Sequence, residues 1–216
     1  MTLKGKYAAE VMGYVNGLID GSIVANKERI QAAKRFARMV EGGRYEIRTT
    51  IADFVIGIIE TTFCHRQGQS PDGTSYVGKP LILEAWEKFC VYGMLIFYHP
   101  GTQERVVKEA FIFIPRKNGK TLFVAALAYG LAMAERGIGA KVYVVGAALK
   151  QAMETFESWR YNFENRLYRS RKEAEKAGWR ILNNSFEHSI TNANIGGGSI
   201  SLNALACNPD SQDSLN

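Results

Sequence analysis

Apolar residues recur at helical spacing in three stretches near the start of the chain. In each stretch they follow an i, i+3, i+4 pattern, which gathers apolar side chains on one face of a helix. Glycines at positions 21, 42 and 43 interrupt the pattern between the stretches. The spacing therefore predicts helices over residues 8–19, 30–40 and 51–63, within a helical N-terminal region that covers residues 1–65.

A turn-rich connector separates this region from the rest of the chain. Residues 66–79 contain Gly, Ser, Pro and Asp at closely spaced positions, a composition typical of turns and boundaries. Another helix is predicted to follow, from Pro80 to Phe89. We expect residues 80–216 to form one further domain.

Two buried strands and a buried helix are predicted within that domain. The apolar runs at 111–114 and 141–146 have the length of buried strands, and the apolar segment 122–134 between them predicts a helix. Two buried strands that flank a helix favour parallel pairing through a right-handed crossover, so the predicted fold class is α/β with a parallel sheet. The helix is shorter than a bilayer crossing requires, so we predict no membrane partner.

Further helices and strands are predicted in the last part of the chain. Residues 151–177 predict one long helix or two shorter ones, with arginine and glutamate side chains paired on a solvent-facing side. Alternating apolar residues around the glycines at 196–198 predict a β-hairpin, or two adjacent strands, over 189–202.

Composition and charge narrow the class of protein only slightly. The 216 residues carry a net charge of +6, which permits a polyanionic partner such as DNA or nucleotide. The basic face of the second helix (Lys34, Arg35 and Arg38) is interpreted as a solvated face, with DNA contact as the alternative. Three cysteines lie far apart without a disulfide or metal-ligand pattern, which favours a reducing cytoplasm. The adjacent Cys64 and His65 are interpreted as structural.

The candidate chemistry lies between the first predicted strand and the helix after it. A strand, a tight polar loop, the tripeptide Gly119-Lys120-Thr121 and a helix form the layout of a phosphate-binding loop. In such a loop, backbone N–H groups and the helix dipole hold phosphate oxygens. Gly119 allows the backbone to approach closely, Lys120 reaches the β- and γ-phosphates, and the Thr121 hydroxyl can ligate Mg²⁺. The generic pattern has glycine where Ile114 stands, so the alternative is a basic surface turn.

The loop resembles a variant found in one family. Residues 115–121, Pro-Arg-Lys-Asn-Gly-Lys-Thr, are similar to the phosphate loop of tailed-bacteriophage terminase large subunits, the ATPases that drive DNA into capsids. In that family the first glycine is commonly missing and an arginine stands inside the loop, as Arg116 does here. The resemblance covers most of the chain. It implies a P-loop NTPase sheet preceded by a helical region, with ATP and Mg²⁺ as cofactors.

The resemblance also implies residue roles and partners. Lys120 and Arg116 are the catalytic candidates, with Arg116 as a positive charge on the γ-phosphate in the transition state. The backbone from Lys117 through Asn118 to Gly119 is expected to cradle the phosphates. The implied partners are double-stranded DNA, a portal, a small terminase subunit and, for the full-length protein, further copies in a homo-oligomeric ring. The implied location is the cytoplasm of an infected bacterial host, at the procapsid portal.

Three residues outside the loop are further candidates. Terminases and related helicases carry an aromatic residue followed by glutamine upstream of the loop, and this pair recognises adenine. Trp86 matches the aromatic residue, but Glu87 replaces the glutamine, and a carboxylate only accepts hydrogen bonds. Gln151 resembles the residue that couples nucleotide state to DNA. The alternatives are that Trp86 belongs to the core and that Gln151 lies on an ordinary helix surface.

The acidic pair that nucleotide hydrolysis requires is missing from the sequence. A hydrolytic P-loop enzyme needs a carboxylate at the end of a second buried strand to hold Mg²⁺, and a group that orients the attacking water. No apolar run after Thr121 ends in Asp-Glu, and Asp210 and Asp213 have the wrong spacing. We therefore expect an incomplete reading frame, inactive as an ATPase and without the family's nuclease domain, with an exposed apolar sheet edge after the last hairpin. The alternatives are a helicase-like P-loop ATPase acting on nucleic acid and a non-hydrolysing module that binds nucleotide or DNA.

Overall fold

The computed structural model describes residues 3–70, 72–115 and 118–207. Within it the chain forms two units, each built from two separate stretches of sequence. Unit 1 comprises Met1–Gly57 and Ile82–Phe113, and unit 2 comprises Ile58–Leu81 and Ile114–Asn216. Compactness alone does not define a functional domain, so the predicted division into 1–65, 66–79 and 80–216 remains a prediction.

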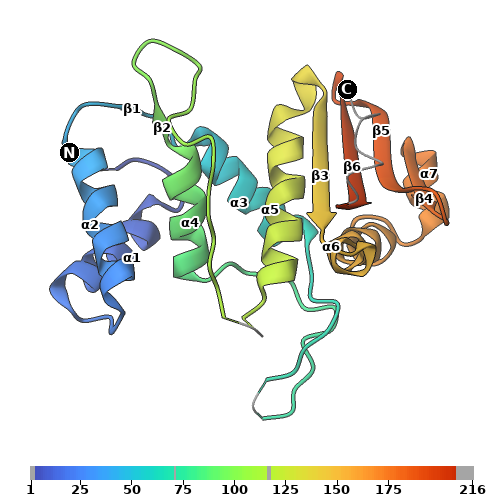
Figure 1. The fold of residues 1–216 in the computed structure, drawn as a ribbon, viewed down its shortest axis with the longest axis horizontal. Coiled ribbons are helices and arrows are strands. Elements are labelled where there is room, and N and C mark those ends of the chain that lie inside the picture. Colours follow the sequence, from blue (N-terminus) through green and yellow to red (C-terminus); the bar gives the residue numbers. More distant parts are fainter. Residues whose placement is uncertain (1–2, 71, 116–117, 208–216) are drawn as a thin grey trace. The chain divides into compact units, whose positions relative to one another are not determined.

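Unit 1 is mainly helical (Figure 1). Its elements are α1 (Ala8–Asp20), α2 (Lys27–Glu41), β1 (Glu46–Ile47), α3 (Thr50–Thr62), α4 (Ala85–Leu95) and β2 (Phe97–Tyr98). The two short strands pair antiparallel, and the last part of α3 belongs to unit 2. The three helices predicted from apolar spacing are confirmed, and the fourth begins at Ala85 rather than at Pro80.

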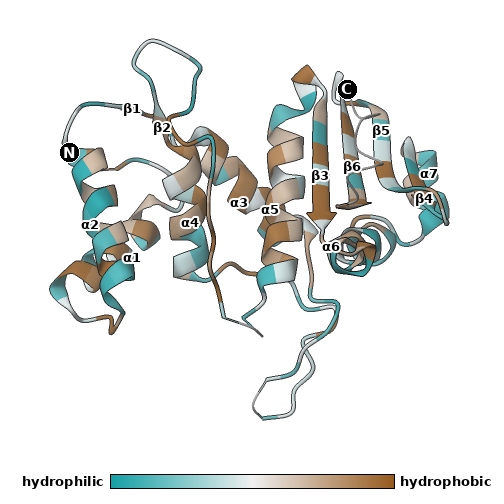
Figure 2. Ribbon diagram, viewed as in Figure 1, coloured by the Kyte–Doolittle hydropathy of each residue, from teal (hydrophilic) through white to brown (hydrophobic). Residues whose placement is uncertain are grey.

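Local sequence explains where the first helices begin and end. α1 stops at Gly21, which adopts a left-handed conformation with a φ of 85° that suits glycine. At the start of α2 the Asn26 side chain accepts a hydrogen bond from the backbone N–H three residues on. Ala33, Phe36 and Val40 are buried on the inner face of α2, and the largely teal ribbon of this helix reflects its polar outer face (Figure 2).

Asp53 ties the N-terminal segment to α3 and α4 within unit 1. Its carboxylate accepts hydrogen bonds from the N–H groups of Lys6 at 2.8 Å and Tyr7 at 3.3 Å, and from the Tyr92 hydroxyl. Burial, together with this neighbouring carboxylate, raises the pKa of Tyr92, so the hydroxyl stays a proton donor. The bonds satisfy a carboxylate that would otherwise be costly to place beside the core.

Unit 2 contains the larger sheet and its covering helices. Its elements are α5 (Lys120–Glu135), η1 (Arg136–Ile138), β3 (Ala140–Gly146), α6 (Leu149–Asn162), the π-helix η2 (Phe163–Leu167), α7 (Arg171–Lys176), β4 (Trp179–Asn183), β5 (His188–Ile195) and β6 (Gly198–Ala206). The predicted helix after the loop, the strand after it and the hairpin are confirmed. The helical segment after β3 is divided by the π-helical turn.

The four strands form a mixed sheet with the order β3-β6-β5-β4. β3 and β6 are parallel, with Ala140 opposite Ile200 and Gly146 opposite Ala206. β4 pairs antiparallel with β5, and β5 antiparallel with β6. The α/β class is confirmed at this level, as helices together with a four-stranded mixed sheet.

Helices cover one face of this sheet and form the core of unit 2 with it. Alternate residues of β6 (Ile200, Leu202 and Ala204) are buried, as expected of a strand with one covered face. α5 and α6 both pack against β3 and β6. The fully buried Trp159 of α6 donates its indole N–H to the Ala125 carbonyl of α5 at 2.7 Å, which fixes one helix against the other.

The strand predicted at 111–114 is wrong. This segment forms neither helix nor strand, and Phe111 and Phe113 are 92% and 85% exposed with their rings stacked. A strand needs a neighbour for its backbone N–H and C=O groups. Among the described residues no strand pairs with this segment. β3 pairs in parallel with β6 instead, so the predicted pairing across α5 is also wrong.

The predicted apolar edge after the last hairpin is wrong as well. Among the described strands, β6 lies inside the sheet between β3 and β5, and β3 and β4 are at the edges. The exposed apolar side chains of the sheet lie on β3, where Tyr143 is 44% and Val145 is 51% exposed.

Together with the 3-10 turn η1 that follows it, α5 is longer than the apolar run counted from the sequence. By length and composition alone, Lys120–Ile138 is the one segment of the described chain that would be able to cross a membrane. In this structure the helix packs into unit 2, with Phe123, Ala126 and Ala132 among its buried residues.

Candidate nucleotide-phosphate site at the start of α5

The tripeptide Gly119-Lys120-Thr121 forms the start of α5. Gly119 precedes the first helical residue and adopts a left-handed conformation with a φ of 69°. Beyond its two neighbours in the chain, no atom of the described residues lies within 4 Å of the position where a Cβ would stand, so backbone conformation rather than space favours glycine here. Its carbonyl accepts the Phe123 N–H at 3.0 Å, which is the first hydrogen bond of the helix.

The start of α5 is open to solvent. Lys120 and Thr121 are exposed, the first turn contains no acidic residue, and no described side chain caps it. The N–H groups of residues 120–122 precede the first bond within the helix and point away from it. These donors and the helix dipole together favour an anion, such as a phosphate group, at this place.

The loop before α5 is described only in part. Arg116 and Lys117 lie outside the described residues. The Asn118 side chain donates a hydrogen bond to the Pro115 carbonyl at 3.3 Å, which closes the loop on itself. The catalytic role of Arg116 and the cradle formed by Lys117 and Asn118 stay predictions.

α5 and α6 both begin at the carboxyl end of β3 (Figure 1). β3 ends at Gly146, whose carbonyl accepts a hydrogen bond from the Cys207 N–H at 2.8 Å. A Cβ on Gly146 would lie 2.8 Å from the Ala148 carbonyl oxygen, so the tight turn into α6 requires glycine. Ligands of open α/β sheets bind at this edge, where helices begin after parallel strands.

Gln151 lies in the first turn of α6 at the same edge. Its backbone N–H donates to the Ala148 carbonyl at 2.9 Å, and its side chain is exposed. In the described part of the chain no hydrogen bond joins it to Lys120 or Thr121. Its role in coupling nucleotide to DNA stays a prediction.

Trp86 and Glu87 belong to unit 1, where they open α4. Glu87 is 6% exposed, and its carboxylate accepts a hydrogen bond from the Glu84 N–H at 2.9 Å. Burial raises the pKa of Glu87 above its ordinary value, and the hydrogen bond from Glu84 opposes this rise. Glu87 thus caps its own helix, a role that the sequence reasoning missed although the two glutamates have the spacing of a capping box. Trp86 is half-buried, and its contact with adenine stays a prediction.

A magnesium ion would find few protein ligands at the start of α5. The described residues contain no group of three or more His, Cys, Asp or Glu side chains that would hold a metal ion. Burial raises the pKa of the Cys64 thiol and lowers that of His65, so both groups are favoured in their neutral forms. Mg²⁺ at the start of α5 would have the Thr121 hydroxyl as its protein ligand, together with phosphate and water oxygens.

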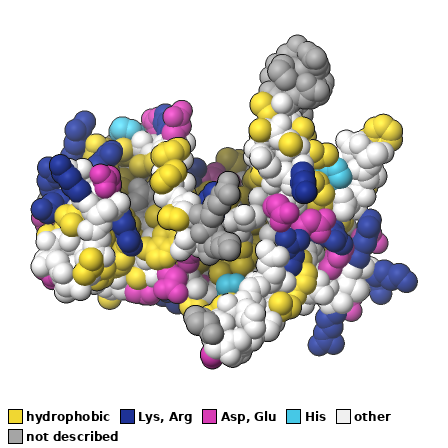
Figure 3. All heavy atoms as spheres, turned by 60° about the horizontal axis from the view of Figure 1, so that its bottom comes forward, with side chains coloured by type: hydrophobic (Ala, Val, Ile, Leu, Met, Phe, Trp, Pro, Cys, Tyr) yellow, Lys and Arg dark blue, Asp and Glu magenta, His cyan; other side chains and the backbone are white. Residues whose placement is uncertain are grey.

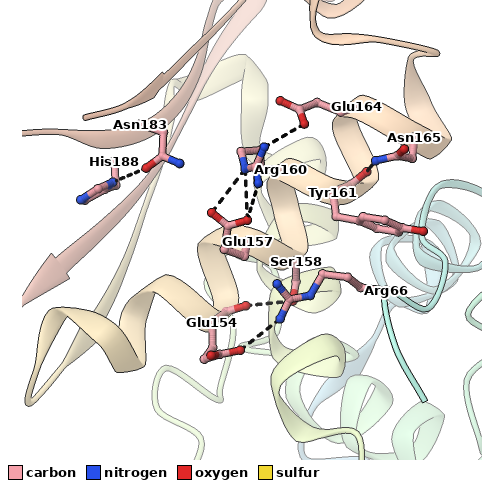
Figure 4. A network of polar contacts seen from close by, with 10 residues as sticks. All are labelled: Arg66, Glu154, Glu157, Ser158, Arg160, Tyr161, Glu164, Asn165, Asn183 and His188. Carbon is pink, nitrogen blue, oxygen red and sulfur yellow. Dashed lines mark hydrogen bonds and ion pairs between the residues drawn. The ribbon is translucent and has the colours of Figure 1, made fainter. Parts of the chain in front are cut away.

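A polar network along α6 holds the start of the connector (Figure 4). Arg66 donates to the Glu154 carboxylate at 3.0 Å, so the connector is attached to the helix that carries Gln151. Arg160 of α6 pairs with Glu157 of the same helix at 2.7 Å and with Glu164 of η2 at 3.0 Å, as the charge spacing predicts. The sequence reasoning missed the Arg66 contact because it joins residues 88 positions apart.

Comparisons with protein-family models, with curated proteins and with solved structures found no match.

Proposed function

We propose that this chain binds the phosphates of ATP at the start of α5. In this proposal it is part of an ATP-driven motor similar to the terminase large subunit, which packages double-stranded viral DNA into procapsids. The observation that carries the nucleotide part is left-handed Gly119 opening α5 beside the carboxyl end of β3, followed by exposed Lys120 and Thr121. The motor part rests on the resemblance of residues 115–121 to the terminase loop. A portal, a small terminase subunit and further copies of the chain are the partners that belong to this proposal, in the cytoplasm of an infected bacterium.

Each residue of the site would act through position and charge. The backbone N–H groups of Lys120, Thr121 and Leu122 would hold phosphate oxygens, and the Lys120 ammonium would offset the charge of the β- and γ-phosphates. Mg²⁺ bound with the nucleotide would neutralise phosphate charge further. The Thr121 hydroxyl would orient that ion, and the loop charge of Arg116 would act on the γ-phosphate.

We further propose that the 216-residue chain binds nucleotide without turnover. The sequence after Thr121 has no apolar run that ends in Asp-Glu, and hydrolysis requires groups that hold Mg²⁺ and orient water. Loss of such positioning and charge stabilisation slows a reaction by orders of magnitude.

Titration with a fluorescent ATP analogue in the presence of Mg²⁺ tests the nucleotide site. We expect saturable binding by the wild-type chain, and about 10- to 100-fold weaker binding by Lys120→Ala, since a hydrogen bond to a charged group contributes about 1.5–3 kcal/mol. Lys172→Ala removes an exposed lysine from α7 and is the matched control, with unchanged affinity expected. Equal affinities of folded Lys120→Ala and wild-type chains would contradict the proposed site.

The motor part of the proposal is tested by binding to duplex DNA. The same chain is expected to bind duplex DNA with an affinity that changes when nucleotide is added, and Gln151→Ala is expected to abolish that change while leaving nucleotide affinity unaltered. DNA affinity that nucleotide does not change in the wild-type chain contradicts the motor part and leaves the nucleotide site standing.

A further inference from the structure

Unit 1 contains a groove that the proposed nucleotide site does not use. It has a volume of about 1070 Å³ and runs along α2 between residues of α1, α4, β2 and the segment after β2. Ile19, Phe89 and Val107 lie in its apolar floor. Ile19 is 37% exposed, and Phe89 and Val107 are half-buried, so apolar surface remains open to solvent there.

A basic rim borders this floor. Lys34, Arg35 and Arg38 lie on the outward face of α2, are exposed, and take part in no ion pair among the described residues. In Figure 3 lysine and arginine side chains gather over the α1 and α2 part of unit 1, beside apolar ones. Glu41 is the one carboxylate among the residues that line the groove. The rim therefore carries unbalanced positive charge next to an apolar floor.

We propose that this groove binds an acidic amphipathic helix of a partner protein. Helix-in-groove recognition places the apolar face of a helix against a hydrophobic floor and leaves its polar flanks at the rim. Carboxylates on those flanks would complement Lys34, Arg35 and Arg38, while the apolar face would cover Phe89 and Val107. Nucleic acid fits less well, because its phosphates would meet the rim but offer no apolar face to the floor.

Two synthetic peptides test this inference by charge complementarity. One is a fluorescein-labelled helix of about 18 residues, or five turns, with leucines along one face and glutamates on both flanks. The other has lysine in place of every glutamate. Measured by fluorescence anisotropy, the glutamate peptide is expected to bind the full chain at least about tenfold more tightly than the lysine peptide, since exposed ion pairs contribute up to about 1 kcal/mol each.

Charge reversal of the rim locates the binding. The triple variant Lys34→Glu, Arg35→Glu, Arg38→Glu is expected to lose affinity for the glutamate peptide at least about tenfold and to gain affinity for the lysine peptide. The control triple variant Lys172→Glu, Lys176→Glu, Arg180→Glu makes the same change of net charge at exposed sites in unit 2 and is expected to bind both peptides as the wild-type chain does. Val107→Ser changes the apolar floor and is expected to weaken the binding of both peptides by the same factor.

Three outcomes overturn the inference. These are no saturable binding of the glutamate peptide, equal response of the rim and control variants, and a rim-dependent preference for a duplex of about 20 base pairs over the glutamate peptide. The single variant Arg38→Glu is measured in parallel. If the triple variant loses its helical circular dichroism, the single variant is expected to show the same changes in peptide affinity at smaller size. The result is separate from that of the nucleotide site, because the rim and floor substitutions belong to unit 1 and α5 belongs to unit 2.

Discussion

The starts of α4 and α5 were both predicted to contact nucleotide, yet their structures are opposite. At the start of α4 the buried Glu87 carboxylate already accepts the Glu84 N–H. At the start of α5, Gly119 offers no side chain, and exposed Lys120 and Thr121 follow without an acidic residue in the first turn. In α4 a carboxylate of the helix itself accepts a backbone N–H at the helix start. In α5 the N–H groups of the first turn are left to solvent or to an anion.

This difference separates two properties that every helix start combines. All helix starts carry unpaired N–H groups and the positive end of the dipole. Only a start without its own carboxylate keeps both properties available to a phosphate. A predicted site at a helix start therefore has to be judged by the capping side chains, and by this criterion α5 and not α4 is suited to the phosphates.

The largest expected effect comes from giving α5 a carboxylate of its own. Thr121→Glu is expected to weaken nucleotide binding about 100-fold or more, since two like charges about 4 Å apart near a protein surface repel with about 4 kcal/mol. The free energy of unfolding should stay level or rise by about 0.3–1 kcal/mol, because the new charge suits the helix dipole. Nucleotide titration and chemical denaturation measure the two quantities. Ser185→Glu, which adds the same charge at an exposed position before β5, is the control. Nucleotide binding by Thr121→Glu as tight as that of the wild-type chain would contradict the difference between the two helix starts.

Removal of the α4 cap should act on stability alone. Glu87→Ala leaves the backbone N–H of Glu84 without its acceptor, and we expect it to lower the free energy of unfolding by about 1–2 kcal/mol. Affinity for inorganic tripolyphosphate should not change, because no phosphate contact is assigned to α4. Denaturant unfolding and isothermal calorimetry give the two values. A large loss of tripolyphosphate affinity with unchanged stability is the opposite result and would contradict the structural role of Glu87.

Gly119→Ala should have a smaller effect on stability. The φ of 69° is left-handed, and an L side chain in that region costs about 1 kcal/mol even where no atom obstructs it. We therefore expect thermal denaturation to show a loss of this size. Gly13→Ala, inside α1 with open space around it, is the matched control and should stabilise the chain slightly. Equal responses of the two glycines would mean that the conformation at Gly119 is not constrained.

The smallest effect is a pH dependence at α4. The pKa of Glu87 is raised by burial, so the folded chain holds this proton more firmly than the unfolded chain. Its stabilising contribution is therefore complete below the ordinary glutamate pKa of about 4.3 and is lost as pH rises through the raised value. Glu87→Gln keeps an acceptor oxygen but does not titrate. Denaturation at several pH values should show the variant gaining stability relative to the wild-type chain as pH rises from about 4 to 7, and a constant difference would contradict the shift.

The helices and the hairpin were predictable because their signals are local. Apolar spacing located α1, α2 and α3, and the glycines at 196–198 located the turn between β5 and β6. The segment 111–114 has the apolar composition of a strand, but composition does not supply a neighbour. Sheet order depends on contacts between distant residues, so the pairing of β3 with β6 was not predictable from either strand.

The sequence predicted the helix start at the candidate site, but it did not reveal the hydrogen-bond partner of Glu87. The pattern Gly119-Lys120-Thr121 correctly marked the start of a helix. The same type of argument assigned Glu87 to adenine because of its place after Trp86, while its spacing from Glu84 carried the capping signal that the structure displays. The structure shows the capping role of Glu87, and its contact with adenine stays a prediction.

The central claim is that the start of α5, and not that of α4, receives phosphate. Titration of the ¹⁵N-labelled chain with magnesium tripolyphosphate, followed by amide NMR, tests it without any contribution from a base or sugar. We predict saturable shifts for the amides of Gly119, Lys120, Thr121 and Leu122, with the amides of Glu84 to Glu87 unmoved. Shifts at Glu84 to Glu87 with none at Gly119 to Leu122, or no shift at either helix start, would contradict it.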